Sequence, residues 1–194
     1  MSSSLIIDIQ SNVVNVSLLS QKNHQLVHTI SHNIAFRDYV NSSRITKAMI
    51  DSVELALLKI LKHTVAIDTI HYVLSSPWVI SQSKTVKIHY QKDSAITEEI
   101  IKVIVDGEKN KILNKSAKNL IFIEQKIFEV RLNGYPVQSY VGRRAKDIEV
   151  SFVLTMSPKN IIEGVCEAVS RHLHVHQEAY HSSLLLQYLA TRSL

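Results

Sequence analysis

Two runs near the middle of the chain alternate between apolar and polar side chains, apart from Val153. They cover residues 128–132 and 148–156, with valine, leucine, isoleucine, phenylalanine or methionine at every second position. A period of two predicts strands that bury one face and leave the other in water. Between the runs lie residues that favour turns, namely Asn133, Gly134, Pro136 and Gly142. We therefore predict a long two-stranded unit with an elaborated connection.

The amino-terminal part reads as a layered α/β unit. Alternation over residues 5–10 and 12–19 predicts a hairpin, and residues 26–36 predict a third, weaker strand. Apolar residues then recur every four positions from Ile45 to Leu61, which predicts a helix whose N-cap is Ser42 or Ser43. Residues 69–74 return as a buried strand. Strands and a helix in this order indicate a helix packed on a sheet.

A turn-forming segment, Ser75 to Trp78, interrupts the pattern, and we place a subdomain boundary there. Further strands and helices are predicted after it. The pattern predicts a strand at 86–90, a helix capped by Thr97, and a frayed helix end with a loop over 108–119. Ser157 is the predicted N-cap of a further helix, with Pro158 at its first position. A short strand is predicted at 173–175. Ser182 or Ser183 then opens a helix over 184–189.

Composition restricts the classes of protein more than it identifies one. The chain has 194 residues, a net charge of +5 and a single cysteine, so a disulfide framework is excluded and a reducing compartment is expected. We find no signal peptide and no apolar run near the ~20 residues of a membrane span, so we expect a soluble cytosolic protein. The densest basic cluster is only Arg143, Arg144 and Lys146, which favours a solvated surface over a nucleic-acid face.

Individual reactive residues point to structure rather than to chemistry. His172, His174 and His176 alternate along one predicted strand; this spacing can bind zinc, but an exposed polar face is the interpretation we favour, so no metal site is predicted. Cys166 falls on the apolar stripe of a predicted helix and is expected to be a small buried hydrophobe. No nucleophile elbow, zinc-protease motif or Walker loop is present, and we predict no catalytic residue.

Three stretches together resemble the bacterial actin-like ATPases, the family that includes FtsA-like cell-division proteins and PilM-like pilus assembly proteins. They are LIIDIQSNVVNVSLL, VLSSPWVISQSKTVKI and KIFEVRLNGYPVQSYVGRRAKDIEVSFVL. The resemblance implies the amino-terminal half of such a protein: a partial actin-like (ribonuclease H-like) α/β domain with an inserted strand–helix–strand–strand subdomain. It assigns residues 1–78 and 178–194 to the partial nucleotide-binding subdomain, and residues 79–177 to the insert.

The resemblance also implies a phosphate site, from which this chain departs. The matching positions are Asp8, Gln10, Ser11 and Asn12. The family has glycine where this chain has Gln10, and a side chain there blocks the approach of a phosphate to the backbone. The family's second phosphate loop and its glycine-rich adenosine loop have no match. ATP with magnesium is therefore implied only for a complete protein, and ATPase activity is the most that this chain could carry.

We interpret the chain as a docking or self-associating scaffold in bacterial cell division or pilus assembly, at the inner face of the cell membrane and reaching the membrane through partners. The predicted partner-binding residues are Tyr135, Tyr140, Arg143, Arg144 and Trp78, because tyrosine, tryptophan and arginine are favoured at interfaces. For Trp78, which follows a proline at the predicted boundary, a packing anchor is the interpretation we favour. One alternative is an ATP-binding ATPase whose second half lies outside this chain. Another is an RNA-binding domain, suggested only by the positive charge.

Overall fold

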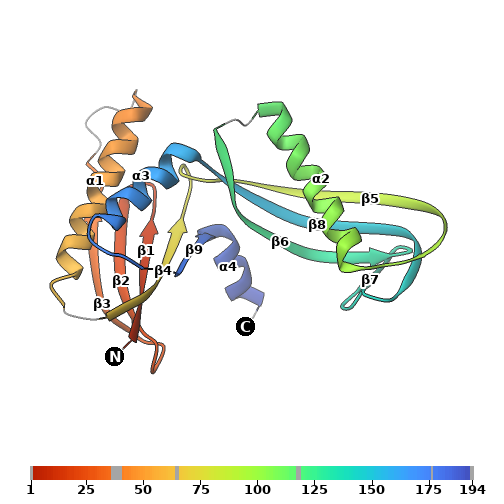
Figure 1. The fold of residues 1–194 in the computed structure, drawn as a ribbon, viewed down its shortest axis with the longest axis horizontal. Helices are drawn as coiled ribbons and strands as arrows, with labels where there is room; N and C mark the ends of the chain where they lie inside the picture. The colour runs from red at the N-terminus through yellow and green to blue at the C-terminus, as the bar shows by residue number, and fades with distance from the viewer. Residues whose placement is uncertain (1, 36–40, 64–65, 117–118, 176, 193–194) are drawn as a thin grey trace. The chain divides into compact units, whose positions relative to one another are not determined.

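The computed structural model describes residues 2–35, 41–63, 66–116, 119–175 and 177–192. Contacts divide the chain into two compact units (Figure 1). The first unit contains residues 1–80 and 157–194, and the second, which we call the insert, contains residues 81–156. A mixed five-stranded sheet forms the first unit and a four-stranded sheet the insert. The predicted α/β class with an inserted subdomain is confirmed.

The sheet of the first unit has the order β3-β2-β1-β4-β9. Strands β1, β2 and β3 are antiparallel neighbours, whereas β4 and β9 run parallel to β1. The predicted hairpin, third strand and returning strand are all present. The third strand is shorter than predicted and ends at Asn33, and Phe36, the end of its predicted range, lies outside the described residues. The strands are β1 Ser2–Ile9, β2 Val13–Ser20, β3 Leu26–Asn33, β4 Ala66–Leu74 and β9 Gln177–Ser182.

The middle of one face of this sheet is apolar. Leu5, Ile7 and Ile9 of β1 are fully buried, and their cross-strand partners in β2 and β4 are buried as well. Helices α1, Ser42–Ile60, and α3, Lys159–Ser170, lie together on this face (Figure 1). Helices that cover these apolar side chains remove them from water, so the alternation in β1, β2 and β4 determines which face of the sheet the helices pack on.

The N-caps of α1 and α3 differ from the prediction. Asn41, not Ser42 or Ser43, caps α1, since its side-chain oxygen accepts hydrogen bonds from the backbone N–H groups of Ser43 and Arg44 at 3.0 and 3.4 Å. At α3 the cap residue is Pro158, with no side-chain cap bond. The hydroxyl of Ser157 instead donates to the Trp78 carbonyl at 2.8 Å, which satisfies a polar group in a buried position.

The residues after α3 do not form the predicted strand at 173–175. The chain turns there, with the Leu173 N–H donating to the Val169 carbonyl at 2.9 Å, and β9 begins only at Gln177. His172 turns back to Glu54 of α1, at 2.9 Å between Nε2 and Oε1, while His176 lies outside the described residues. Helix α4, Ser183–Arg192, follows β9 as predicted, and the hydroxyl of Ser182 accepts from the Leu185 N–H.

The insert consists of a four-stranded sheet with one helix on its apolar face (Figure 1). Strand order is β5-β8-β6-β7, so the three strands predicted to share a sheet do so. Isoleucines of α2 pack with buried residues of β6 and β8 to form its core. The elements are β5 Ile80–Ala95, α2 Glu98–Ser116, β6 Leu120–Leu132, β7 Tyr135–Val137 and β8 Arg144–Pro158.

Helix α2 is longer than its sequence suggested. Thr97 is its N-cap, with the hydroxyl accepting from the Ile100 N–H at 3.3 Å, as predicted. The predicted fraying over 108–119 is wrong as far as Ser116, because the helix continues through Gly107. Its last turns carry ion pairs at spacing three, including Lys111 with Glu108 at 2.6 Å, and such pairs support a helix whose composition is highly polar.

The connection between β6 and β8 uses the predicted turn residues. Asn133 and Gly134 have φ of 48° and 85° and join β6 to β7 in a two-residue turn. Gly142 has φ of 79°. Asparagine and glycine tolerate this left-handed conformation better than other residues, which explains why they occur at these positions.

The outer face of the insert sheet is polar. Neighbouring side chains of β5 and β8 pair across it, with Lys87 to Glu149 at 2.9 Å and His89 to Asp147 at 2.7 Å. Arg131 of β6 adds a contact to Glu129 at 2.6 Å. One apolar face covered by α2 and one paired polar face are typical of an antiparallel sheet that is half solvated.

Candidate functional site

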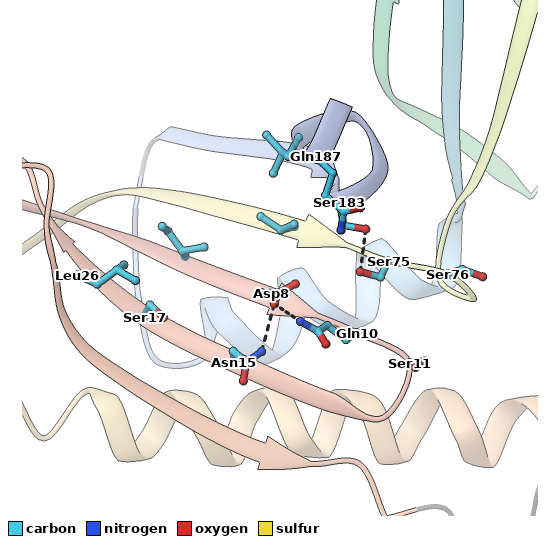
Figure 2. A pocket seen from close by; sticks show the side chains of 13 residues that line it. Asp8, Gln10, Ser11, Asn15, Ser17, Leu26, Ser75, Ser76, Ser183 and Gln187 are labelled. Atoms are coloured by element: carbon cyan, nitrogen blue, oxygen red, sulfur yellow. Dashed lines mark hydrogen bonds between the residues drawn. The ribbon is translucent and has the colours of Figure 1, made fainter. Parts of the chain in front are cut away.

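A pocket of about 550 Å³ opens on the polar side of the first unit's sheet (Figure 2). It lies at the carboxyl ends of β1 and β4, beside the start of α4. In open α/β sheets this edge is where ligands usually bind. The side chains that line it are Ile6, Asp8, Gln10, Ser11, Asn15, Ser17, Leu26, Val73, Ser75, Ser76, Ser183, Leu186 and Gln187.

Asp8 is the only acidic or basic side chain in the pocket lining, and one of its oxygens is paired within the chain. Its Oδ2 accepts hydrogen bonds from Gln10 Nε2 at 2.7 Å and from Asn15 Nδ2 at 3.1 Å (Figure 2). Asn15 is the cross-strand partner of Asp8, and the Ser31 hydroxyl in turn donates to Asn15 Oδ1 at 2.7 Å. One oxygen of the carboxylate is thus already occupied by two amides of the same sheet.

Gln10 is held in place by its backbone as well as by its side chain. Its backbone N–H donates to the Val13 carbonyl at 2.9 Å and closes the β1–β2 turn, and its own carbonyl accepts from Trp78 Nε1 at 2.8 Å. Its φ is not positive, so a residue with a side chain occupies position 10 without backbone strain. The side chain of Gln10 therefore stays over Asp8.

Trp78 is a packing anchor rather than a contact surface. It is only 3% exposed, and its indole N–H reaches the Gln10 carbonyl. A side chain buried to this extent is not available to a partner, so Trp78 does not belong with the predicted partner-binding residues. The remote pairing of residues 10 and 78 was not visible in the sequence.

We expect the substitution Trp78→Phe to lower the free energy of unfolding by about 1–2 kcal/mol. The ring stays buried, but the Gln10 carbonyl loses its donor inside the protein. Thermal melting followed by circular dichroism measures the change. Tyr135→Phe, at a residue 75% exposed, is the control and should leave the melting temperature unchanged. A variant Trp78→Phe as stable as the wild type would contradict this account.

Of the remaining residues predicted to bind phosphate, Ser11 lies in the pocket lining and Asn12 does not. Ser11 lines the pocket and is exposed on the β1–β2 turn. Asn12 is exposed but does not line the pocket, and its carbonyl accepts from the Ile34 N–H at 2.8 Å. Two serines that sequence reasoning missed, Ser75 and Ser183, meet across the pocket at 2.9 Å between their hydroxyls. Their positions after β4 and at the start of α4 were the available signal.

This lining does not fit ATP with magnesium. None of the lining residues is lysine or arginine, and the one charge is that of Asp8, which repels phosphate. The Gln10 amide takes an Asp8 oxygen that a hydrated magnesium ion would use. Phosphate sites in proteins are built instead from backbone N–H groups, glycines and basic side chains. The pocket lining therefore offers no positively charged side chain to a triphosphate.

The predicted partner-binding residues of the insert lie on or beside the connection from β6 to β8. Tyr135 is 75% exposed at the start of β7, and Arg143 is exposed. Tyr140 is half-buried against the insert core, and the Arg144 guanidinium donates to the Asp93 carbonyl at 2.8 Å. Tyr135 and Arg143 therefore offer accessible side-chain surface. Arg144 is exposed as well, but its guanidinium is engaged with Asp93, and Tyr140 packs on the insert core.

A partly buried polar cluster at the β4–β9 edge was not predicted. The hydroxyls of Tyr72 and Tyr180 both donate to the Glu178 carboxylate, at 3.2 and 3.1 Å, and the rings stack at 4.8 Å. Cys166 Sγ contacts the Tyr180 hydroxyl at 2.8 Å. Burial, followed by the neighbouring Glu178 charge, raises the pKa of Tyr72 well above its usual range. Burial also raises the pKa of the Cys166 thiol, which is half-buried rather than fully buried as predicted. A raised pKa lowers the fraction of reactive thiolate.

On the pocket side of the same edge, His71 and His181 are stacked, with 3.3 Å between Nδ1 of His71 and Nε2 of His181. Burial and the charge of His181 lower the pKa of His71. No group of three or more metal-ligating side chains occurs among residues 2–35, 41–63, 66–116, 119–175 and 177–192. In the same residues, no helix has both the length and the apolar character needed to cross a membrane.

Comparison with solved structures gives the class to which this architecture corresponds. The fold is a mixed α/β fold that matches about half of an actin-like ATPase domain. A chain from the PilM–PilN type IV pilus biogenesis complex matches 91% of this chain with a TM-score of 0.56 at 12% identity. This chain spans only 47% of that protein. The likeness therefore establishes the fold.

Two further solved structures are similar at lower scores. The cytoplasmic domain of EpsL, an inner-membrane component of the type II secretion system of Vibrio cholerae, has a TM-score of 0.43 at 6% identity, over 92% of this chain and 56% of that one. A Bacteroides thetaiotaomicron protein of actin-like ATPase fold and unknown function also has 0.43, at 12% identity, over 98% and 56%. No protein-family model and no curated protein sequence matches the chain.

Proposed function

We propose that this protein is a non-catalytic scaffold of a bacterial pilus-type assembly, which works by docking to a protein or to itself. The support is the actin-like fold shared with a chain of the PilM–PilN complex, whose name describes an assembly of proteins. The proposed location is the cytoplasmic side of the inner membrane, with the membrane reached through partners. A scaffold of cell division would work in the same way and is distinguished by the identity of the partner.

The observation that carries the proposal is the hydrogen bond from Gln10 to Asp8. On an actin-like sheet this carboxylate faces the edge where a ligand would bind. In this chain one oxygen of the carboxylate accepts hydrogen bonds from the Gln10 and Asn15 amides, and the pocket lining lacks a basic residue. A scaffold in which these polar side chains pair with one another explains this arrangement, because uncompensated polar groups would otherwise destabilise the fold.

The insert is the proposed docking element, extending over residues 79–177 in the division inferred from sequence. The contact-based insert is shorter, residues 81–156, because α3 packs on α1. Its exposed Tyr135 and Arg143 have the side-chain types that dominate binding energy at protein interfaces. Both lie in a connection held by glycine and asparagine turns, so they are presented on an ordered segment.

Isothermal titration with Mg-ATP tests the absence of a nucleotide function. We expect no saturable binding at millimolar nucleotide, for the wild type and for Asp8→Ala alike. Micromolar binding by the wild type that is lost in Asp8→Ala would refute the proposal. It would favour the alternative, an ATP-binding protein whose second half lies outside this chain.

Cross-linking in the native host tests the docking role. A photo-reactive amino acid at Tyr135 should capture a component of a pilus, secretion or division assembly, and Arg143→Glu should reduce that capture about tenfold or more. The same photo-reactive group at Asn110, exposed on α2, is the matched control. Equal capture from both positions, or capture of no envelope-assembly protein, would count against the proposed surface.

A further inference from the structure

One edge of the insert sheet is open over most of its length. β6 has β8 on one side and β7 on the other, but β7 pairs only with Val130, Arg131 and Leu132. Within the described residues no strand pairs with 120–129 on the β7 side. A strand edge of this length is a template for pairing with another strand.

The sequence of this open segment is self-complementary. Residues 122–128 read Phe-Ile-Glu-Gln-Lys-Ile-Phe, which is symmetric about Gln125 in size and shape and antisymmetric in charge. If two copies pair antiparallel about Gln125, phenylalanine faces phenylalanine and isoleucine faces isoleucine. Glu124 of each copy then faces Lys126 of the other, and opposite charges directly across a strand pair are stabilising.

The other edge of the same sheet is protected against such pairing. β5 carries Lys84, Lys87 and Lys92 with a single acidic residue, Asp93. Lysines on an edge strand oppose the approach of a second strand, and proteins commonly use them for this purpose. On β6 the only charges from 120 to 128 are Glu124 and Lys126, which cancel. The β5 edge therefore has an excess of positive charge, whereas the β6 edge from 120 to 128 has no net charge.

We propose that a second copy of this chain pairs with β6, antiparallel and centred on Gln125, to form a two-fold dimer with one sheet running through both insert units. The pairing spans residues 121–129, since β7 occupies the edge from Val130 onward. The arrangement is isologous, as in most homodimers. This dimer would be one of the contacts through which the proposed scaffold assembles. Its biological role rests on the proposed scaffold function.

Charge variants test the register directly. Analytical ultracentrifugation should show a dimer for the wild type and a dissociation constant raised about tenfold to a hundredfold for Glu124→Lys and for Lys126→Glu, because each places like charges together twice in the dimer. The double variant Glu124→Lys/Lys126→Glu should restore the dimer. An equimolar mixture of the two single variants should form a heterodimer tighter than either homodimer, since every facing pair is then of opposite charge.

A cysteine at the two-fold axis gives a second measurement. In a Cys166→Ser background, Gln125→Cys should form an intermolecular disulfide under mild oxidation, because residue 125 faces its own copy. Gln91→Cys, exposed on β5, is the matched control and should not form the cross-link. Circular dichroism of every variant establishes that it is folded.

Three outcomes would overturn the dimer. The first is a wild type that is monomeric at about 100 µM, which is well above the micromolar range of specific association. The second is that the charge variants dimerise as well as the wild type. The third is equal cross-linking at positions 125 and 91. None of these affects the capture of an assembly partner at Tyr135, so failure of the dimer is distinguishable from failure of the proposed function. A dimer that behaves as expected without any partner captured at Tyr135 would support the self-pairing alone.

Discussion

Phe152→Ala is expected to lower the free energy of unfolding of the insert by about 3–5 kcal/mol. Phe152 of β8 is fully buried, and the insert core around it includes Val150, Leu154 and isoleucines of α2. Removing the ring discards its transfer free energy and leaves a cavity that a sheet covered by a single helix can only partly fill. The insert is small, so a loss of this size is a large part of its stability.

Urea denaturation followed by circular dichroism measures this loss. Leu113→Ala is the control: Leu113 is 40% exposed on α2, and its truncation should cost less than about 1 kcal/mol. Fluorescence of Trp78, the only tryptophan, reports separately on the first unit. A loss below about 1 kcal/mol for Phe152→Ala would show that the insert core is not packed as described.

Above about pH 10 the protein is expected to lose stability at about 1.4 kcal/mol per pH unit for Tyr72 alone. Burial, followed by the Glu178 charge, raises the pKa of Tyr72, so the folded state keeps a proton that the unfolded chain releases. Stability from this group is therefore complete below the unfolded pKa and declines as the pH rises above it. Burial also raises the pKa of Tyr180 and Cys166 in the same cluster, which acts in the same direction.

Urea denaturation at a series of pH values from about 8 to about 11, which spans the ordinary tyrosine pKa, gives the slope. Tyr72→Phe keeps the fully buried ring and removes the hydroxyl that donates to Glu178, so its stability should depend less steeply on pH. Tyr135→Phe, at an exposed tyrosine, should retain the wild-type slope. Wild-type stability that is unchanged above about pH 10 would refute the assignment of the cluster.

The periodic elements were predictable because the alternation of apolar and polar residues follows which side chains are buried. Alternation in β1, β2, β6 and β8 follows which side chains face the helices, and the turn at Asn133 and Gly134 follows from the conformations those residues tolerate. Where the local signal was ambiguous, prediction failed. The last turns of α2 are stabilised by ion pairs in a sequence without periodicity, and the alternation at 173–175 lies in a connection that forms no strand.

The candidate site was only partly predictable. Asp8 and Ser11 were identified by resemblance and line the pocket, whereas Ser75 and Ser183 come from segments that only the parallel pairing of β4 and β9 brings together. The contact of Gln10 with Asp8 depends on a backbone position held by Trp78, a residue remote in sequence. Hydrogen bonds between distant residues leave no periodic trace in the sequence, because each requires only one suitable residue at each end.

The amino-acid sequence by itself determined which residues form most of the strands and helices and which faces are apolar, since each of these depends on neighbours along the chain. Tertiary structure alone decided that α3 packs on α1, that one oxygen of Asp8 is paired with two amides of the same chain, and that the edge of β6 is open from residue 129 toward its amino end. These features depend on which distant segments meet, and that is settled by packing and strand order in three dimensions.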